Sequence, residues 1–234
     1  MVRYNRIIQK DPREIVLLKS RPCQWGRCFF CDYIDDNSEE DDNLNDFNEQ
    51  VLKNVTGEFE KLEVINSASV FELPKGSLKN IKDVVINKGI KEIYFECHWS
   101  YRNRLREIQD YFPGIKVRFN TGIETFDNDF RNKYLKKGAA FESPEEVAKY
   151  FYIAYLLVGI QGQTKEMIAK DVDIVLNYFD RGRINIYENN STPVKADPEL
   201  IQWFREEYGY LEDMDKIEIL WNTTDFGVGA EDEY

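Results

Sequence analysis

Short apolar runs rich in β-branched and aromatic residues alternate with segments of helical period along this chain of 234 residues. Six of these runs precede a helical segment: Ile15–Arg21, Leu62–Asn66, Glu92–Cys97, Lys116–Asn120, Tyr152–Gly159 and Arg183–Tyr187. This alternation is typical of repeated β–α units and predicts a parallel sheet. Because six units are too few to close an eight-stranded barrel, we expect an α/β fold, an open partial (β/α)6 barrel, in one domain over 1–234. A last run, Ile217–Trp221, predicts an edge strand.

The helical segments carry start signals of their own. The first has apolar residues at helical spacing from Leu44 to Phe59. We expect Ser77 and Asp127 to cap the second and fourth helices, because short polar side chains accept hydrogen bonds from the first free N–H groups. The sequence Ser143-Pro-Glu-Glu146 is a capping box with proline at the first helical position, and Asp197-Pro198 predicts the start of the last long helix.

Composition bounds the class of protein. At 27.7 kDa with 42% apolar residues, the chain has enough apolar material for a full core. It has no run of eighteen apolar residues and no targeting signal, so we expect a cytoplasmic protein with no membrane span. The net charge of −12 opposes binding to a phosphate backbone and favours a neutral or cationic small molecule over nucleic acid.

Three of the four cysteines, Cys23, Cys28 and Cys31, lie in a loop that we expect over 22–33, directly after the first strand. Three thiolates on such a loop can hold three irons of a [4Fe–4S] cube and leave the fourth iron open to another ligand. A structural zinc site needs four ligands, and the other candidates, Cys97 and His98, are far away in sequence. Disulfide frameworks are typical of small secreted chains. The pattern favours the cluster, with zinc and disulfides as the alternatives.

Polar residues are concentrated at the carboxyl ends of the predicted strands, where the loops of such barrels carry catalytic groups. These residues are Asn66, Ser67, Glu96, His98, Asn120, Glu124, Tyr187, Glu188, Asn189 and Asn190, with Gly159 ending the fifth strand. Glu96 and His98 alternate on the third strand, so they share a face. The alternative for the lone histidine is a hydrogen-bonded core residue. Cys97 points to the opposite face as a small buried residue.

Two further segments have more than one interpretation. The acidic stretch 32–46 is either a metal site or, as such charge runs favour, a solvated loop. The carboxyl-terminal tail from about 215 to 234 either folds over the barrel mouth as a lid, packs on a second subunit or packs along the edge of the sheet.

The cysteine loop resembles that of the radical S-adenosylmethionine (SAM) superfamily, with four residues instead of the usual three between the first two cysteines. The resemblance covers roughly 15–193. It implies an enzyme in which Cys23, Cys28 and Cys31 bind a [4Fe–4S] cluster. An external reductant such as flavodoxin or ferredoxin supplies an electron, SAM is cleaved, and the 5′-deoxyadenosyl radical takes a hydrogen atom from the substrate.

The same resemblance implies SAM-binding residues. Phe30 would pack near the adenine, and the backbone of Tyr33 would meet the adenine amine. The segment Asn66-Ser-Ala-Ser69, which lacks the usual glycines, would receive the methionine amino group. Asn120 and Glu124 would contact the ribose and methionine parts, and the backbone near Gly159 and Ile160 would support the adenine. Glycines 159 and 162 also have a structural interpretation as turn residues.

Within the superfamily, the length, the cysteine spacing and the segment Glu-Cys-His-Trp99 most resemble the compact lyases that release 7-aminomethyl-7-deazaguanine from queuine in queuosine salvage, by cleaving a carbon–nitrogen bond. The second resemblance is to 7-carboxy-7-deazaguanine synthase, and the alternative from another class is a non-catalytic iron–sulfur or zinc protein.

A queuine-type substrate has a cationic amine, a base edge, a flat ring and a diol. We expect Glu96, Glu188 or Asp225 to pair with the amine, and Asn189, Asn190 or Asn222 to read the base edge. Tyr187 or Trp99 would stack on the ring, and Glu96 and His98 would bind the diol, directly or through a second divalent metal. Glu96, His98 and Tyr187 are the candidate catalytic residues. Short barrels often complete themselves with a neighbour, so we expect a homodimer.

Overall fold

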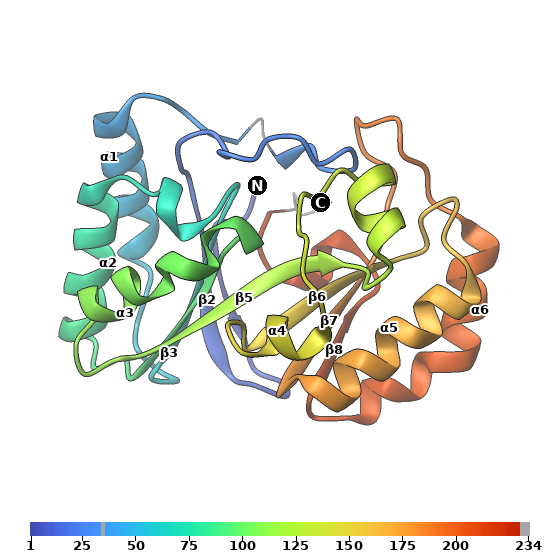
Figure 1. The fold of residues 1–234 in the computed structure, drawn as a ribbon. Helices are drawn as coiled ribbons and strands as arrows, with labels where there is room; N and C mark the ends of the chain where they lie inside the picture. The colour runs from blue at the N-terminus through green and yellow to red at the C-terminus, as the bar shows by residue number, and fades with distance from the viewer. Residues whose placement is uncertain (34–35, 230–234) are drawn as a thin grey trace. The chain divides into compact units, whose positions relative to one another are not determined.

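A computed structural model describes residues 1–33 and 36–229 of the chain. Its eight strands form one sheet in chain order, β1-β2-β3-β4-β5-β6-β7-β8. The strands are β1 (Tyr4–Ile7), β2 (Arg13–Leu18), β3 (Lys61–Asn66), β4 (Glu92–Glu96), β5 (Lys116–Glu124), β6 (Ile153–Val158), β7 (Arg181–Ile186) and β8 (Ile217–Leu220) (Figure 1). β1 pairs antiparallel with β2, whereas the pairs β2–β3, β3–β4, β5–β6, β6–β7 and β7–β8 are parallel.

The chain divides into two compact units, each discontinuous in sequence. The first comprises the described residues of Met1–Gly26, Tyr33–Phe119 and Thr224–Tyr234, and the second comprises Arg27–Asp32 and Asn120–Thr223. The cysteine loop contributes to both: Cys23 belongs to the first unit, and Cys28 and Cys31 belong to the second. Each unit is described by itself below.

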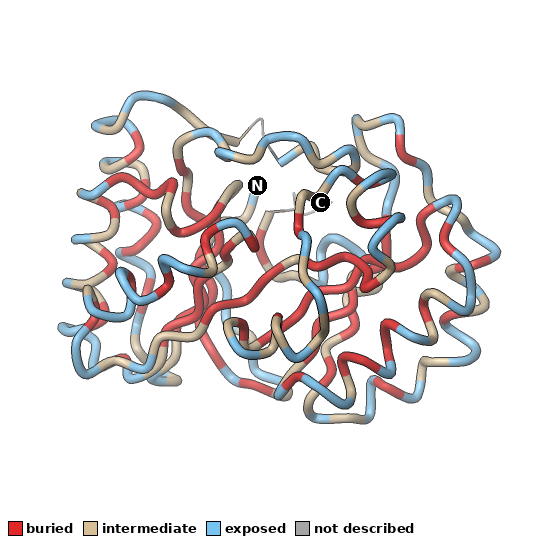
Figure 2. The backbone as a smooth tube through the Cα atoms, viewed as in Figure 1, coloured by how far each residue is buried: buried red, intermediate tan, exposed pale blue. Residues whose placement is uncertain are grey.

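In the first unit, the helices α1 (Asp41–Leu52), α2 (Lys75–Asn87) and α3 (Leu105–Tyr111) accompany strands β1–β4, and α1 lies alongside α2 (Figure 1). Most residues of β2, β3 and β4 are buried, whereas the residues of β1 are exposed or only partly buried (Figure 2). On one strand face, Ile15 and Ile65 form an apolar cluster with Val228 from the carboxyl-terminal tail. The tail is also tied to the amino terminus, because the N–H of Gly229 donates to the carbonyl of Val2.

In the second unit, the helices α4 (Pro144–Ala148), α5 (Lys165–Tyr178) and α6 (Pro198–Tyr208) accompany strands β6–β8. Helix α5 approaches β7 closely at Gly182, where an added Cβ would lie 2.2 Å from Cγ1 of Val175. The described residues also form five short helices. Val70–Glu72 and Trp99–Arg104 belong to the first unit, Phe130–Tyr134 and Gly209–Asp213 belong to the second, and the last is Thr223–Phe226.

The six predicted strands and the predicted edge strand are all present, within a few residues of their expected ends. The predicted caps at Ser143 and Asp197 are also confirmed, since their side chains accept from the N–H groups of Glu146 and Leu200. The other half of the expected capping box is replaced, because the Glu146 carboxylate accepts from the N–H of Glu142. At the fourth helix, Asp127 accepts from the N–H of Phe130 at 2.7 Å.

Other local expectations were wrong. Ser77 lies inside α2, which begins earlier, after Pro74; its buried hydroxyl is hydrogen-bonded to Asn48 and Asn45. Helix α1 starts at Asp41 and ends at Leu52, so residues 41–46 of the acidic stretch are helical rather than loop. β4 ends at Glu96, so His98 does not lie on the strand, and the shared face expected for the two residues has no basis in the strand geometry. Strand β1 was not predicted.

Two acidic residues of the stretch form ion pairs, whereas Glu39, Glu40, Asp42 and Asp46 are exposed to solvent. Asp36 makes a two-pronged ion pair with Arg3, and Asp41 pairs with Arg21. Residues 34–35 of the acidic stretch and 230–234 of the tail lie outside the described residues. The described tail packs along the strands, as Val228 does, and a lid role stays a prediction. Across the described residues, no helix has the length and apolar character needed to cross a membrane.

Candidate functional site

None of the four cysteines forms a disulfide among the described residues; the three of the loop are partly exposed, and Cys97 is buried. In the first unit, Sγ of Cys23 accepts from the N–H of Gly26 at 3.5 Å. The next residue, Gln24, donates its N–H to Oε1 of the buried Glu72 at 3.3 Å. The hydroxyl of Tyr101 lies within hydrogen-bond distance of Oε1 of both Gln24 and Glu72 and shares its one proton between them. The residue that follows Cys23 is therefore fixed by contacts with Glu72 and Tyr101 of the first unit.

In the second unit, a buried ion pair lies beside the other two cysteines. Nζ of Lys137 donates to Oε1 of Glu124 at 2.7 Å, and their side chains are 13% and 7% exposed. Burial alone would lower the pKa of Lys137, but the Glu124 carboxylate and the sulfurs of Cys28 and Cys31 raise it above its ordinary value. Lys137 is therefore a fixed cation next to two thiols.

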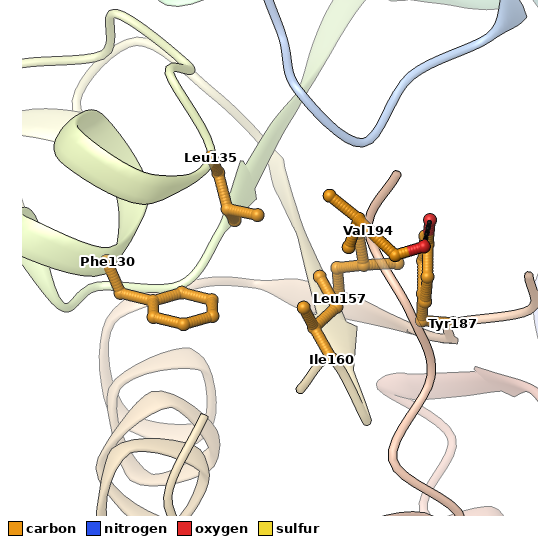
Figure 3. Close-up of a cluster of buried hydrophobic side chains, with 6 residues drawn as sticks. All are labelled: Phe130, Leu135, Leu157, Ile160, Tyr187 and Val194. Atoms are coloured by element: carbon orange, nitrogen blue, oxygen red, sulfur yellow. Dashed lines mark hydrogen bonds between the residues drawn. The ribbon is translucent and has the colours of Figure 1, made fainter. Parts of the chain in front are cut away.

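Phe30, between these cysteines, packs against a buried apolar cluster of the second unit. The cluster consists of Phe130, Leu135, Leu157, Ile160, Tyr187 and Val194 (Figure 3). The N–H of Phe29 donates to the carbonyl of Leu135 at 2.9 Å, which ties the cysteine segment to the same cluster. This gives an apolar wall that would suit a flat ring.

The donor set fits an iron–sulfur cluster by its chemistry. Thiolates are the ligands of such clusters, and each cysteine binds a different iron atom, so the sulfurs need not converge on one ion. A single-ion site does require such convergence, and within 1–33 and 36–229 no group of three or more His, Cys, Asp or Glu side chains could hold a metal ion. That finding also gives no support to a metal at His98 or in the described part of the acidic stretch.

At the end of β3, Asn66 carries a buried polar atom that the protein leaves unsatisfied. Its Nδ2 donates to the carbonyl of Ser69 at 3.1 Å, but Oδ1 has no partner among the described residues. A buried acceptor of this kind carries a cost unless a donor reaches it. The ammonium group of SAM is such a donor, so Asn66 fits the role that the resemblance implies. The hydroxyl of the neighbouring Ser67 is engaged with the carbonyl of Asp36 at 2.9 Å.

The segment after β4 is built around His98. Its Nδ1 accepts from the N–H of Ser100 at 3.2 Å, capping the short helix Trp99–Arg104, and its ring stacks on Trp25 at 5.6 Å between centroids. Trp99 is 3% exposed, and Arg102 lies over its ring. Glu96 is partly buried at the end of the strand. His98 thus has a structural role as a helix cap. Roles of Glu96, His98 and Trp99 in binding a substrate stay predictions.

The expected cofactor residues of the second unit are well ordered by hydrogen bonds. Nδ2 of Asn120 donates to the hydroxyl of Tyr155, which also accepts from Arg183. The N–H groups of Gly159 and Ile160 both donate to Oε1 of Gln163 at 2.9 Å. Gly159 has φ of +92° and no room for a Cβ beside Ile201, so it is required as glycine for structural reasons. Tyr33, in the first unit, is 63% exposed.

The loop after β7 holds four predicted residues. Burial raises the pKa of Tyr187, whose hydroxyl reaches Asn190 and Thr192. Glu188 is exposed and accepts from the N–H of Thr223 at 2.9 Å, and Oδ1 of the exposed Asn189 accepts from the N–H of Ala196. In the first unit, Asp225 is exposed within the short helix Thr223–Phe226.

Comparison with known proteins identifies the family. No protein-family model matches the chain. An uncharacterised protein of Methanocaldococcus jannaschii is 27% identical over 170 residues, which cover 61% of this chain and 45% of that protein, so the match spans about half the length of this curated relative. A solved structure of queuine lyase from Clostridium spiroforme, bound to SAM and queuine, is 50% identical, with a TM-score of 0.96 over 98% of this chain and 100% of that one.

The chain belongs to the queuine lyase family. The match confirms the resemblance to radical SAM enzymes, and the open partial (β/α)6 barrel is the fold of this family member. Sequence reasoning missed Glu72 and Lys137, which interact with the cysteine loop, and Gln24, the residue of the loop that contacts Glu72. Only Lys137 carried a signal, as one of two adjacent lysines after the fourth strand of an acidic chain.

Proposed function

We propose that this chain is a radical SAM lyase that converts queuine to 7-aminomethyl-7-deazaguanine. The observation that carries the proposal is the 50% identity to a queuine lyase over nearly the whole chain, together with the three cysteines of the loop that follows β2. When bound, a [4Fe–4S] cluster and SAM supply a radical that removes a hydrogen atom from the substrate.

The residues of this chain would bind and orient these groups. Cys23, Cys28 and Cys31 are the ligand set, and Lys137 supplies a positive charge beside two of them. In the first unit, Oδ1 of Asn66 is the acceptor proposed for the SAM ammonium group. In the second unit, the apolar cluster that packs against Phe30 would exclude water from the adenine ring of SAM.

The substrate residues are proposed on their chemistry. Glu188 presents an exposed carboxylate at the carboxyl end of β7, where it would pair with the cationic amine of queuine. Asn189 would read the base edge from the same loop, and the ring of Tyr187 would stack on the base. The other residues predicted to contact the substrate are the carboxylates Glu96 and Asp225 and the side chains of His98 and Trp99. A cytoplasmic location, an external reductant and a homodimer complete the proposal.

The test is anaerobic turnover. Protein reconstituted with iron and sulfide and reduced with dithionite should form 5′-deoxyadenosine faster when queuine is present, and mass spectrometry should detect 7-aminomethyl-7-deazaguanine. Cys28→Ser should abolish both products, whereas Cys97→Ser, which changes a buried thiol away from the loop, should retain them. Turnover of a pterin without any response to queuine would assign the synthase activity instead. A preparation that binds zinc and no iron would end the proposal.

A further inference from the structure

The side chain of Asn190 is bound to the cysteine loop across 160 positions of sequence. Its Nδ2 donates to the carbonyl oxygen of Phe30 at 2.8 Å and to Oδ1 of Asp32 at 3.3 Å. Phe30 and Asp32 are the two sequence neighbours of Cys31. All of these residues belong to the second unit.

The amide oxygen of Asn190 is occupied as well. It accepts from the N–H of Thr192 at 3.0 Å, from the hydroxyl of Thr192 at 2.7 Å and from the hydroxyl of Tyr187 at 3.2 Å. An asparagine side chain has two N–H donors and two lone pairs on its oxygen. While these bonds hold, Asn190 has no capacity left to read the edge of a base.

The next residue of the same loop binds the same target. Oδ2 of Asp32 accepts from the N–H and from the hydroxyl of Ser191, both at 3.2 Å. The two consecutive residues Asn190 and Ser191 thus contact both neighbours of Cys31 with four hydrogen bonds. The segment Arg27–Asp32 has no helix or strand of its own, so bonds of this kind decide where its thiols lie.

We propose that Asn190 is a positioning residue for Cys31: with Ser191, it holds the third cluster ligand in place from the loop after β7. The inference rests on the proposed function, since the position of this thiol matters to activity only if it binds the cluster. Groups that orient metal ligands typically change metal affinity or activity by about tenfold to a hundredfold when they are removed.

The first experiment uses metal-free, reduced protein. Alkylation of each thiol by iodoacetamide is followed by mass spectrometry in the wild type, in Asn190→Ala and in the matched control Asn189→Ala, which loses only the bond to Ala196. We expect Asn190→Ala to raise the rate at Cys31 about tenfold, because the two hydrogen bonds to Phe30 and Asp32 are lost. The control should leave that rate unchanged. The buried Cys97 is the internal reference. An unchanged rate at Cys31 overturns the inference.

Asn190→Asp provides a second variant in case the alanine variant does not fold. It keeps the size and one acceptor but replaces both N–H donors with an oxygen that faces the Phe30 carbonyl and the Asp32 carboxylate. It should raise the Cys31 rate at least as much as the alanine variant. An alkylation rate at Cys31 equal to that of the wild type would likewise contradict the positioning role of Asn190.

The second experiment uses the loaded enzyme. Asn190→Ala should lose iron to a chelator about tenfold faster than the wild type and should shift the electron paramagnetic resonance signal of the reduced cluster. Its KM for queuine should stay within about twofold of the wild type, since the residue does not touch the base. A raised KM with unchanged iron loss would make Asn190 a base reader and overturn the inference. If the wild type binds no iron–sulfur cluster, the proposed function fails. The comparison of alkylation rates at Cys31 still tests whether Asn190 holds that residue in place.

Discussion

Replacing Lys137 with methionine tests the buried ion pair that lies beside Cys28 and Cys31. The substitution keeps an unbranched side chain but leaves the carboxylate of Glu124, which is 7% exposed, without its cation. Removing one member of a buried pair typically costs about 3–5 kcal/mol, because the remaining charge stays buried and unpaired. For a chain of this length each kcal/mol lowers the melting temperature by roughly 2–4 °C, so we expect Lys137→Met to lower it by about 10 °C.

The assay is thermal unfolding of the metal-free protein at pH 7 under reducing conditions, arranged as a double-mutant cycle. Glu124→Gln alone should also destabilise, and the double variant Lys137→Met/Glu124→Gln should recover much of the loss, because no unpaired charge remains. The control is Lys133→Met. That lysine pairs with Asp129 on the surface, with side chains 75% and 66% exposed, and an exposed pair contributes at most about 1 kcal/mol. Additive losses in the cycle, or an equal loss in the control, would refute the reasoning.

Three further predictions address the thiols, a buried carboxyl and the substrate. Iron analysis should find full loading in Cys97→Ser and a severe deficit in Cys28→Ser; equal loading would remove Cys28 from the ligand set. Burial raises the pKa of Asp171 to about 7, against about 3.9 in an unfolded chain, so the folded form binds the proton more tightly and loses stability as pH rises from about 4 to 7. Asp171→Asn still accepts from the N–H of Phe126 and should gain melting temperature over the wild type between pH 5 and pH 8; parallel profiles would contradict this. Glu188→Gln should raise the KM for queuine about tenfold in steady-state kinetics, because a charge-assisted contact is lost, and an unchanged KM would exclude that contact.

The strands were predictable because their signal is local. Runs such as Ile153–Val158 are apolar at every position, which only a doubly covered parallel strand can bury. Strand β1 has no such signal. Its residues Asn5 and Arg6 are exposed, and it is a strand only because it pairs with β2. A tertiary contact of this kind leaves no periodicity for a sequence to show.

Side-chain roles were less predictable than strand ends. Ser77 has the residue type of a helix cap, yet its hydroxyl is buried against Asn45 and Asn48, because the helix begins two residues earlier. His98 and Glu96 were placed on one strand face by their alternation, but β4 ends between them. In both cases a small boundary shift changed the outcome: the helix cap lies at Pro74, three residues before Ser77, and the strand ends at Glu96, one residue before its expected end.

The partners of the cysteine loop show where sequence reasoning stops. Glu72 follows β3, Lys137 follows β5 and Asn190 follows β7, so each comes from the carboxyl end of a different strand, the region that the strand-end rule selects. That rule gives the region but not the partner. The contact between Asn190 and Phe30 joins residues 160 positions apart, and nothing in either local sequence specifies it. A spacing of cysteines therefore predicts which sulfur atoms would bind a cluster, whereas the residues that hold those atoms in place are determined by the fold. Substitution of Glu72, Lys137 or Asn190 should therefore change the reactivity of the loop thiols, although all three cysteines are still present.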